Sequence, residues 1–324
     1  MSESEVDVVG VGNAIVDVIT QSSDDFVAGQ GLEKGSMTLI DETRAHQLYE
    51  LMGPGIEASG GSAANTVAGV ASFGGTAADI GKVRGDVLGE VFAHDMRASG
   101  VSFDVPAASE GPATARCLIL VTPDAQRTMN TYLGISSLLE PDDVDSATVE
   151  RGKILFCEGY LWDVDSAKQS IRKAMDIARA AGRRVAFTAS DSFCVERHHA
   201  EFLDLVSGPI DILFANTAEL TRLYESDFDA AVDKVRQHVE LGCLTMGKEG
   251  SLLVTSDEVV EIAAEEIAPV VDTTGAGDQY AAGVLYGLAQ GYSLAEAGRL
   301  GSLAAAEVIS HVGPRPLTPL SQLA

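Results

Sequence analysis

Positive charge is scarce in this sequence. Its 324 residues include 22 lysines and arginines against 48 aspartates and glutamates, which gives a formal net charge of −26. Nucleic-acid backbones and anionic membranes are bound through positive surfaces, so the sequence predicts neither kind of partner. A small anionic ligand is still compatible with this balance, because a few local backbone N–H groups can outweigh a distant surface field.

Cysteine and long apolar runs are scarce as well. The four cysteines stand far apart and form no CxxC pair, which argues against a zinc site or a disulfide framework and predicts reduced thiols in the core. No uncharged apolar stretch approaches the length that spans a membrane. The acidic start, MSESEVDVV, lacks the basic segment and the apolar run of a signal peptide. We therefore expect a cytoplasmic protein.

What the sequence does contain is an alternation of strand-like and helix-like segments. The strand-like segments are 154–157, 184–188, 210–214 and 241–246, and the helix-like segments between them are 165–181, 195–206 and 217–224. This order predicts an α/β fold with a mostly parallel sheet covered by helices. Ligands of such sheets bind beyond the carboxyl ends of the strands, so each strand-to-helix loop is a candidate site.

The N-terminal part of the chain follows a different pattern. Residues 6–12 are a short apolar run that predicts a buried strand, and residues 16–20, 34–41 and 114–133 also have extended patterns. Thr-Pro-Asp at residues 122–124 marks a turn within the last of these segments. Few helical patterns accompany them, so we predict a small separate β layer.

Two glycine-rich segments resemble phosphate-binding motifs but lack a required residue. After Gly10 and Gly12, the dinucleotide fingerprint needs a small residue at the position of Ile15. Residues 242–248 fit GxxxxGK, but the next position is Glu249, which offers no hydroxyl to magnesium. Neither segment therefore predicts its usual nucleotide site.

A third glycine-rich segment, DTTGAGD at residues 272–278, leads into a helical pattern. Small residues at a helix start leave the first backbone N–H groups uncovered, and these groups with the helix dipole suit an anion. Asp278 then falls in the first turn. It either complements the dipole or, beside a transferring phosphate, accepts the proton of an attacking hydroxyl, and spacing alone favours neither role.

Polar residues at other predicted loops also allow two interpretations. Ser62 is a predicted N-cap of a helix over residues 63–73, and Asn65 in its first turn either binds paired hydroxyls or faces solvent. Asn13 and Asp17 follow the first strand and either meet a hydroxyl-rich ligand or form an ordinary turn.

Asn216 and Glu219 lie three residues apart at a predicted helix start, so their side chains share a face. They either hold magnesium through its water molecules, since this ion keeps part of its hydration shell, or cap the helix.

Taken together, these segments resemble the ribokinase or PfkB family of carbohydrate and nucleoside kinases. DTTGAGDQYAAGVL is similar to the family's C-terminal signature and GGSAANTVAGVASFG to its N-terminal signature. NTAEL resembles the NxxE magnesium motif, and TMGKEGSLL resembles the TxGxxG nucleotide segment. All occur in the family's order, so the resemblance covers nearly the whole chain.

The resemblance implies a fold and a division of the chain. The fold would be a ribokinase-like three-layer α/β/α sandwich with a mostly parallel central sheet and a small β-sheet lid. Residues 1–324 would form a single kinase domain, with the lid formed by about residues 14–41 and 101–133. Both monomers and homodimers occur in this family, so the resemblance leaves the oligomeric state open between them.

It also implies roles for individual residues. Asp278 would deprotonate the substrate hydroxyl, and the backbone N–H groups of Gly275, Ala276 and Gly277 would form an anion hole. ATP and Mg²⁺ would be the cofactors, with Asn216 and Glu219 organising magnesium through water.

The expected ATP contacts also include Thr245, Gly247, Gly250 and Thr274, besides Gly275 and Gly277. The expected substrate contacts are Asn13, Ile15, Asp17, Met37, Gly60, Gly61 and Asn65. Some family members need a monovalent cation such as K⁺, for which Asp272 and Thr274 are the candidates here.

Within the family the chain is most similar to the adenosine kinases, through GNAIVDVI and the strand at residues 127–131. Arg127, Met129 and Thr131 share a face of that strand, so Arg127 is expected to reach a phosphate while the other two border a base. Tyr160, Leu161 and Phe193 are expected to complete an apolar slot for a purine. The resemblance therefore implies ATP-dependent phosphorylation of the 5′-hydroxyl of adenosine, giving AMP and ADP.

Two alternatives remain open from the sequence. Another kinase of the same family would act on ribose, fructose, inosine or guanosine. A protein of another class would bind nucleotides on the same scaffold and regulate without catalysis.

Overall fold

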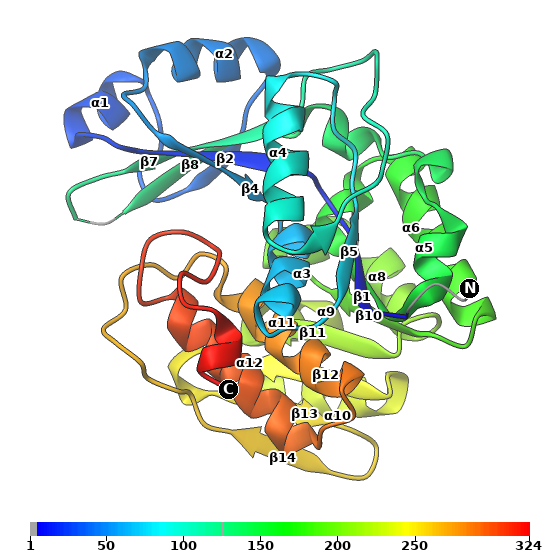
Figure 1. Cartoon of the computed structure of the whole chain (residues 1–324). Helices are drawn as coiled ribbons and strands as arrows, with labels where there is room; N and C mark the ends of the chain where they lie inside the picture. Colours follow the sequence, from blue (N-terminus) through cyan, green and yellow to red (C-terminus); the bar gives the residue numbers. More distant parts are fainter. Residues whose placement is uncertain (1–4, 125) are drawn as a thin grey trace.

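The computed structural model describes residues 5–124 and 126–324 and contains two β-sheets with helices packed around them (Figure 1). The larger sheet has the strand order β14-β13-β12-β11-β10-β9-β1-β5-β6. Its strands are β1 (Val6–Val11), β5 (Ala77–Ile80), β6 (Val101–Ser102), β9 (Gly152–Glu158), β10 (Arg184–Thr188), β11 (Ile212–Asn216), β12 (Leu241–Thr245), β13 (Ser251–Val254) and β14 (Val259–Ile262). All pairings are parallel except those of β12 with β13 and of β13 with β14.

Helices cover both faces of this sheet, because its strands alternate buried side chains between two cores. In β9, Leu155 and Cys157 belong to one core, whereas Ile154 and Phe156 belong to the other. The first core is closed by α5 (Ser146–Arg151), α6 (Asp165–Ala180), α7 (Ser192–Arg197), α8 (His199–Val206), α9 (Thr217–Tyr224) and α10 (Phe228–His238). The second is closed by α3 (Ser62–Ser72), α4 (Val87–Ala98), α11 (Ala276–Ala289) and α12 (Leu294–Val308). The predicted three-layer α/β/α arrangement with a mostly parallel sheet is confirmed.

The second sheet has five strands in the order β3-β8-β7-β2-β4. These are β2 (Ile15–Gln21), β3 (Met37–Leu39), β4 (Ile56–Gly60), β7 (Ala115–Val121) and β8 (Arg127–Tyr132). Two helices accompany it at the top left of Figure 1, namely α1 (Asp24–Gly29) and α2 (Glu42–Leu51). Each begins with an aspartate or serine N-cap, Asp41 for α2 and Ser23 for α1.

The structure corrects the sequence prediction for this part of the chain in four places. Residues 6–12 do not join the small β layer, since β1 lies in the large sheet between β9 and β5. The extended segments have helical partners after all, since α1 and α2 lie between β2 and β4 in the sequence. The edge strand β4 lies outside the two predicted lid ranges, although it pairs with β2. Conversely, β6 at the start of the second range belongs to the large sheet. The apolar pattern did not show which strand belongs to which sheet, because short strands of both sheets have similar compositions.

Glycines in α11 allow this helix to pack closely against α12. A Cβ atom on Gly283 would lie 2.4 Å from the backbone carbonyl of Leu300, and one on Gly287 would lie 2.7 Å from the Cα of Ala297. Backbone therefore packs on backbone between α11 and α12, with α11 also packed against α3. The first turn of α11, which contains Asp278, is consequently held in a fixed position against the sheet.

None of the helices in residues 5–124 and 126–324 is long and apolar enough to cross a bilayer.

Replacing Gly283 by alanine tests this packing. The added Cβ has no space beside Leu300, so we expect the free energy of unfolding to fall by about 1–3 kcal/mol, the usual cost of overpacking. Urea denaturation followed by circular dichroism measures it. Gly29→Ala is the matched control, because a Cβ at Gly29 would meet no atom within 4 Å. Equal stabilities of the two variants would contradict the proposed close approach.

Candidate active site

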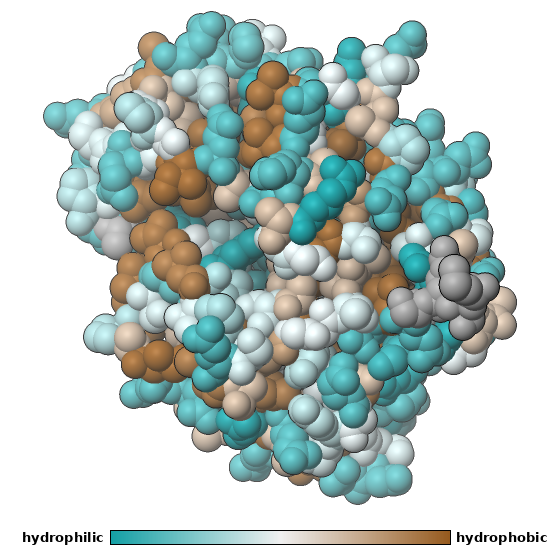
Figure 2. Space-filling view, viewed as in Figure 1, coloured by the Kyte–Doolittle hydropathy of each residue, from teal (hydrophilic) through white to brown (hydrophobic). Residues whose placement is uncertain are grey.

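A cavity of about 870 Å³ lies between the second sheet and the carboxyl ends of the large sheet. Residues that follow β1, β9, β10, β11 and β12 line one side of it, and residues of β2, β3, β7 and β8 line the other. Figure 2 shows the surface hollowed between these two parts of the molecule. The cavity is therefore where the strand-to-helix loops of a parallel sheet place ligands.

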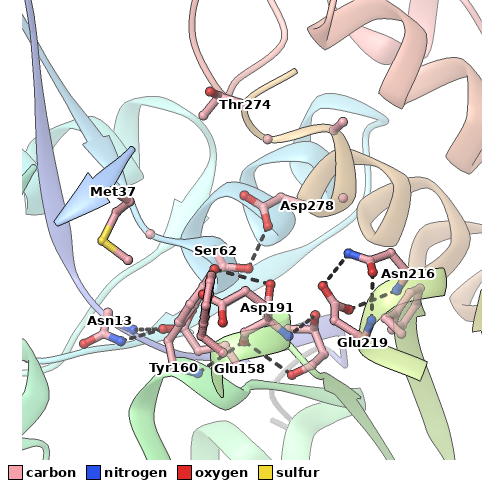
Figure 3. A pocket seen from close by; sticks show the side chains of 18 of the residues that line it. Asn13, Met37, Ser62, Glu158, Tyr160, Asp191, Asn216, Glu219, Thr274 and Asp278 are labelled. Atoms are coloured by element: carbon pink, nitrogen blue, oxygen red, sulfur yellow. Dashed lines mark hydrogen bonds between the residues drawn. The ribbon is translucent and has the colours of Figure 1, made fainter. Parts of the chain in front are cut away.

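Asp278 lies on the cavity wall, in the first turn of α11. Its Oδ1 accepts a hydrogen bond of 2.6 Å from the Ser62 hydroxyl (Figure 3). Its Oδ2 accepts one of 3.0 Å from the Asn65 side-chain amide. Both donors come from the first turns of α3. Two helix N-termini thus converge on one carboxylate.

Burial raises the pKa of Asp278, while the hydrogen bonds from Ser62 and Asn65 and the charge of Arg315 act in the opposite direction. A carboxyl group with a raised pKa is a better proton acceptor than an exposed aspartate, and the donors favour its charged form and orient it. The arrangement suits a general base.

The predicted anion hole, residues 275–277, begins α11 and borders the cavity. Gly275 has a φ of 77° and lies against Pro314, where a Cβ would be 2.7 Å from the proline Cα. A glycine is therefore required at this turn. A Cβ on Gly277, by contrast, would meet no atom within 4 Å, so this side of the helix start is open.

The sequence analysis predicted Ser62 as the N-cap of α3, and this prediction is wrong. Gly61 occupies that position with a φ of 97°, and a Cβ there would lie 2.1 Å from the Asn13 carbonyl oxygen. The Ser62 side chain is thereby left to bind Asp278. Gly60 is similarly tight, because its Cβ would collide with the Asp17 carboxylate.

Asn13 and Asp17 line the cavity beneath the second sheet. Asn13 donates from its backbone and its side-chain amide to Glu158 Oε1, each at 2.8 Å, and Ala63 N donates to Glu158 Oε2 at 2.8 Å. Glu158 therefore ties the end of β1 to the start of α3. Burial raises the pKa of Glu158 to about 7 and that of Asp17 to about 7. The sequence analysis missed Glu158, which ends an apolar strand and carries no motif.

Several predicted base-contacting residues lie together on the cavity wall. Ile15, Met37, Met129 and Thr131 line it from the second sheet, where β3 pairs with β8 and places Met37 opposite Met129. Leu39, Cys117 and Leu133 extend the same wall and were not predicted. Tyr160 and Phe193 face it from the large domain (Tyr160 is labelled in Figure 3).

Leu161 does not contact the cavity. It is 1% exposed and belongs to the core beside Trp162, because the 3-10 helix at Gly159–Asp163 turns it inward. A strand end followed by a tight helical turn reverses the direction of successive side chains. The prediction that Leu161 joins Tyr160 in a slot overlooked this turn.

Arg127 reaches out of the second sheet to the loop before α11. Its guanidinium forms an ion pair of 2.5 Å with Asp272 and donates to the Thr274 hydroxyl at 2.8 Å. Asp272 also accepts from the backbone N–H groups of Thr274 and Gly313. The carboxylate predicted as a monovalent-cation ligand is thus paired with a cationic side chain of the protein.

Asn216 and Glu219 form a capping box at the start of α9. Glu219 accepts from the Asn216 backbone at 2.9 Å and from its side chain at 2.5 Å, and the Asn216 side chain accepts from the Glu219 backbone at 3.0 Å. Both residues nevertheless line the cavity, and burial raises the pKa of Glu219 to about 7. Capping accounts for their spacing without excluding a ligand, since each carboxylate oxygen has a second lone pair.

The described residues contain no group of three or more His, Cys, Asp or Glu side chains arranged to hold a metal ion. A magnesium ion here would have to be held through water and a polyphosphate, which is how that ion is commonly held. Glu219 would be the carboxylate available to its water molecules.

The predicted nucleotide segment is divided by the fold. Thr245 ends β12 and lines the cavity, whereas Gly247 and Gly250 lie in the turn between β12 and β13 and do not. Gly250 has a φ of 93°, and a Cβ there would be 2.0 Å from the Ile262 carbonyl oxygen. The geometry of this turn alone accounts for a glycine at position 250.

Comparison with known proteins decides the family. Residues 56–320 match the pfkB family of carbohydrate kinases. The chain belongs to this family. Its members are phosphotransferases that act on hydroxyl groups of sugars or nucleosides, and they generally use ATP with Mg²⁺.

Two solved structures match this pfkB-family kinase over 99% of its length and 98% of their own, each with a TM-score of 0.92. The adenosine kinase from Sinorhizobium meliloti is 50% identical, and the probable sugar kinase from Rhizobium etli CFN 42 is 47% identical. The 5-dehydro-2-deoxygluconokinase of Geobacillus kaustophilus (strain HTA426) is 26% identical over 263 residues, 78% of each chain. The ribokinase-like fold is therefore shown, while the relatives differ in their acceptors.

Asp278→Asn tests the base directly. The amide keeps the shape of the carboxylate but cannot take a proton, so we expect kcat to fall about 100-fold or more with little change in melting temperature. A coupled assay of ADP release measures it. Asp227→Asn is the control, because Asp227 only caps α10 and asparagine caps equally well. A kcat above about one tenth of the wild-type value would contradict the assignment.

The raised pKa of Asp278 also predicts a pH dependence. Because the base is inactive when protonated, kcat should fall as the pH is lowered through a pKa above the usual aspartate value of 3.8. A pH–rate profile with no acidic limb above that value would contradict this prediction.

Proposed function

We propose that this chain phosphorylates the 5′-hydroxyl of adenosine with Mg-ATP, giving AMP and ADP. The observation that carries the proposal is the position of Asp278. Its carboxylate lies in the first turn of α11 and at the wall of a cavity that is lined on its other side mainly by apolar residues. An acceptor hydroxyl in the cavity and a phosphoryl group at the helix start would both be within its reach.

In this mechanism, Asp278 takes the proton of the 5′-hydroxyl as the oxygen attacks the γ-phosphorus in line. The backbone N–H groups of Gly275 and Gly277 stabilise the negative charge on the transferring group, since they are fixed before the reaction. The Ala276 N–H would contribute by leaving its 3.3 Å hydrogen bond to the Thr273 carbonyl. Arg127 does not line the cavity; its bond to the Thr274 hydroxyl and its ion pair with Asp272 hold the same loop in place. Bound magnesium would neutralise charge on the phosphates, with Glu219 and Asn216 holding its water molecules.

The cavity wall favours a nucleoside over a free sugar. Aliphatic and sulfur-containing side chains line it from the second sheet, namely Ile15, Met37, Leu39, Cys117, Met129 and Leu133. A free sugar presents hydroxyls on most of its surface, and these would lose hydrogen bonds to water against such a wall. A purine base would bury its apolar faces there, while Asn13 and Asp17 meet the ribose hydroxyls.

The 50% identical adenosine kinase supports the same acceptor. A second candidate follows from the other relatives, because a probable sugar kinase is almost as similar and more distant relatives phosphorylate sugars. On that alternative the acceptor is a hexose or pentose, and the apolar wall encloses only part of it.

A panel of acceptors separates these functions. With Mg-ATP, we expect kcat/KM for adenosine to exceed that for ribose, fructose or 5-dehydro-2-deoxygluconate by at least about 100-fold, because an unfilled apolar pocket forfeits several kcal/mol of binding. Inosine serves as the matched purine nucleoside control. ADP release and identification of the product as the 5′-phosphate measure the outcome.

A faster reaction with a free sugar would contradict the adenosine proposal and support the sugar-kinase alternative. Tight binding of adenosine and ATP without turnover would instead indicate a nucleotide-binding protein without catalysis.

A further inference from the structure

The segment that follows α12 is bonded to the loop that starts α11. The backbone N–H groups of Val271 and Asp272 donate to the Ile309 carbonyl, and Gly313 N donates to Asp272 Oδ2. The Gln279 side chain donates to the Pro314 carbonyl at 3.0 Å. The next residue, Arg315, is therefore placed beneath the site by a series of hydrogen bonds rather than by chance contact.

The Arg315 side chain points toward the start of α3. Its Nε donates to Asn65 Oδ1 at 3.2 Å, while its terminal nitrogens contact the Met96 sulfur at 3.2 Å and the Ser99 hydroxyl at 3.4 Å. Arg315 is not among the residues that line the cavity. Its contact with the site is therefore indirect and runs through Asn65, which bonds both Arg315 and Asp278.

A guanidinium can only donate hydrogen bonds, so it accepts one orientation of the Asn65 amide. With Oδ1 turned to Arg315, the Nδ2 group must point the other way, where it donates to Asp278 Oδ2 at 3.0 Å. The opposite orientation would place an N–H against the guanidinium and an oxygen against a carboxylate. Arg315 therefore selects the amide orientation that supports an ionised Asp278.

Arg315 is also a cation among acidic groups from several elements. Asp17 of β2, Asp79 of β5, Asp95 of α4 and Asp278 of α11 all act on its charge, and in the described part of the chain it forms no direct ion pair with any of them. Glu158 of β9 and Tyr160 also face Asp278, and neither carries positive charge. Arg315 opposes the repulsion among these carboxylates, and Arg127 also does so at Asp17.

The pKa values of the neighbouring acids agree with this arrangement. Burial raises the pKa of Asp17 to about 7 and that of Asp79 to about 8, and the charge of Arg315 lowers both, as it lowers that of Asp278. Without this cation each carboxyl would hold its proton more strongly.

We propose that Arg315 is a positioning residue for Asp278: it fixes the Asn65 amide against the carboxylate and places a positive charge behind it. This inference rests on the proposed role of Asp278 as the base, but it does not depend on which acceptor is used. It gives the C-terminal segment a function in the reaction, although no atom of Arg315 touches the cavity.

The test compares Arg315→Met, which keeps the length of the side chain but removes its charge, with Arg315→Lys, which keeps the charge but loses the planar donor group. The pH–rate profile of kcat is measured for both with the acceptor that the wild-type protein phosphorylates fastest. Arg236→Met is the control, because Arg236 is held by the Thr255 and Ser256 carbonyls away from the cavity. Melting temperatures are recorded for every variant.

For Arg315→Met we expect the acidic limb of the profile to move to higher pH by about one unit, because loss of a cation raises the pKa of a nearby carboxyl. We also expect kcat at pH 7 to fall at least about 10-fold, since the carboxylate loses the amide that aligns it and a smaller fraction of it is ionised. Arg315→Lys should keep the acidic limb close to its wild-type position while losing part of kcat. The control should change neither.

A lower kcat in Arg315→Met with an unmoved acidic limb, or a profile like that of the wild type, would overturn the proposal. If Arg315→Met does not fold, the lysine variant decides: an acidic limb shifted upward despite the retained charge would contradict the electrostatic role. A wild-type protein that phosphorylates no acceptor would overturn the proposed function instead, and that outcome is visible before any variant is made.

Discussion

One carboxylate held between two helix starts organises this molecule. Asp278 begins α11, and its partners Ser62 and Asn65 begin α3, 216 and 213 residues earlier in the sequence. The helices can approach because a Cβ at Gly69 of α3 would lie 2.3 Å from the Gln279 side chain of α11. Burying a charged group is costly unless donors satisfy it, so this contact fixes both helices and the loops before them.

Other polar contacts near the same two helix starts set the position of the second sheet above the cavity. It leaves the large domain at Asn13, which Glu158 ties to the start of α3, and it returns at Gly61. At its other end, Arg127 pairs with Asp272 beside the start of α11. The sheet is therefore joined to both helix starts. Its apolar inner wall faces Asp278 for this reason, and the acceptor that fits between them is proposed to be a nucleoside.

Sequence patterns predicted the layers and pointed to the loop before α11 as a candidate site, because both rest on local signals. Short segments of sequence are enough to recognise the apolar strands β9 to β12 and the glycines of the loop before α11. Glu158, Arg315 and the partnership of Ser62 with Asp278 depend on residues far apart in the chain, and no local pattern marks them. Leu161 shows that a local pattern can also mislead, because an apolar side chain suits a ligand-binding slot as well as the core. Only the turn at Gly159–Asp163 decides between them.

A crystal structure of the complex with adenosine tests the central claim most directly. The account predicts the 5′-oxygen within about 2.6–3.2 Å of a carboxylate oxygen of Asp278, the distance a general base requires. It also predicts the purine against Met37 and Met129 and the ribose hydroxyls at Asn13 and Asp17. Adenosine bound with its 5′-oxygen turned away from Asp278, or bound outside this cavity, would contradict the account.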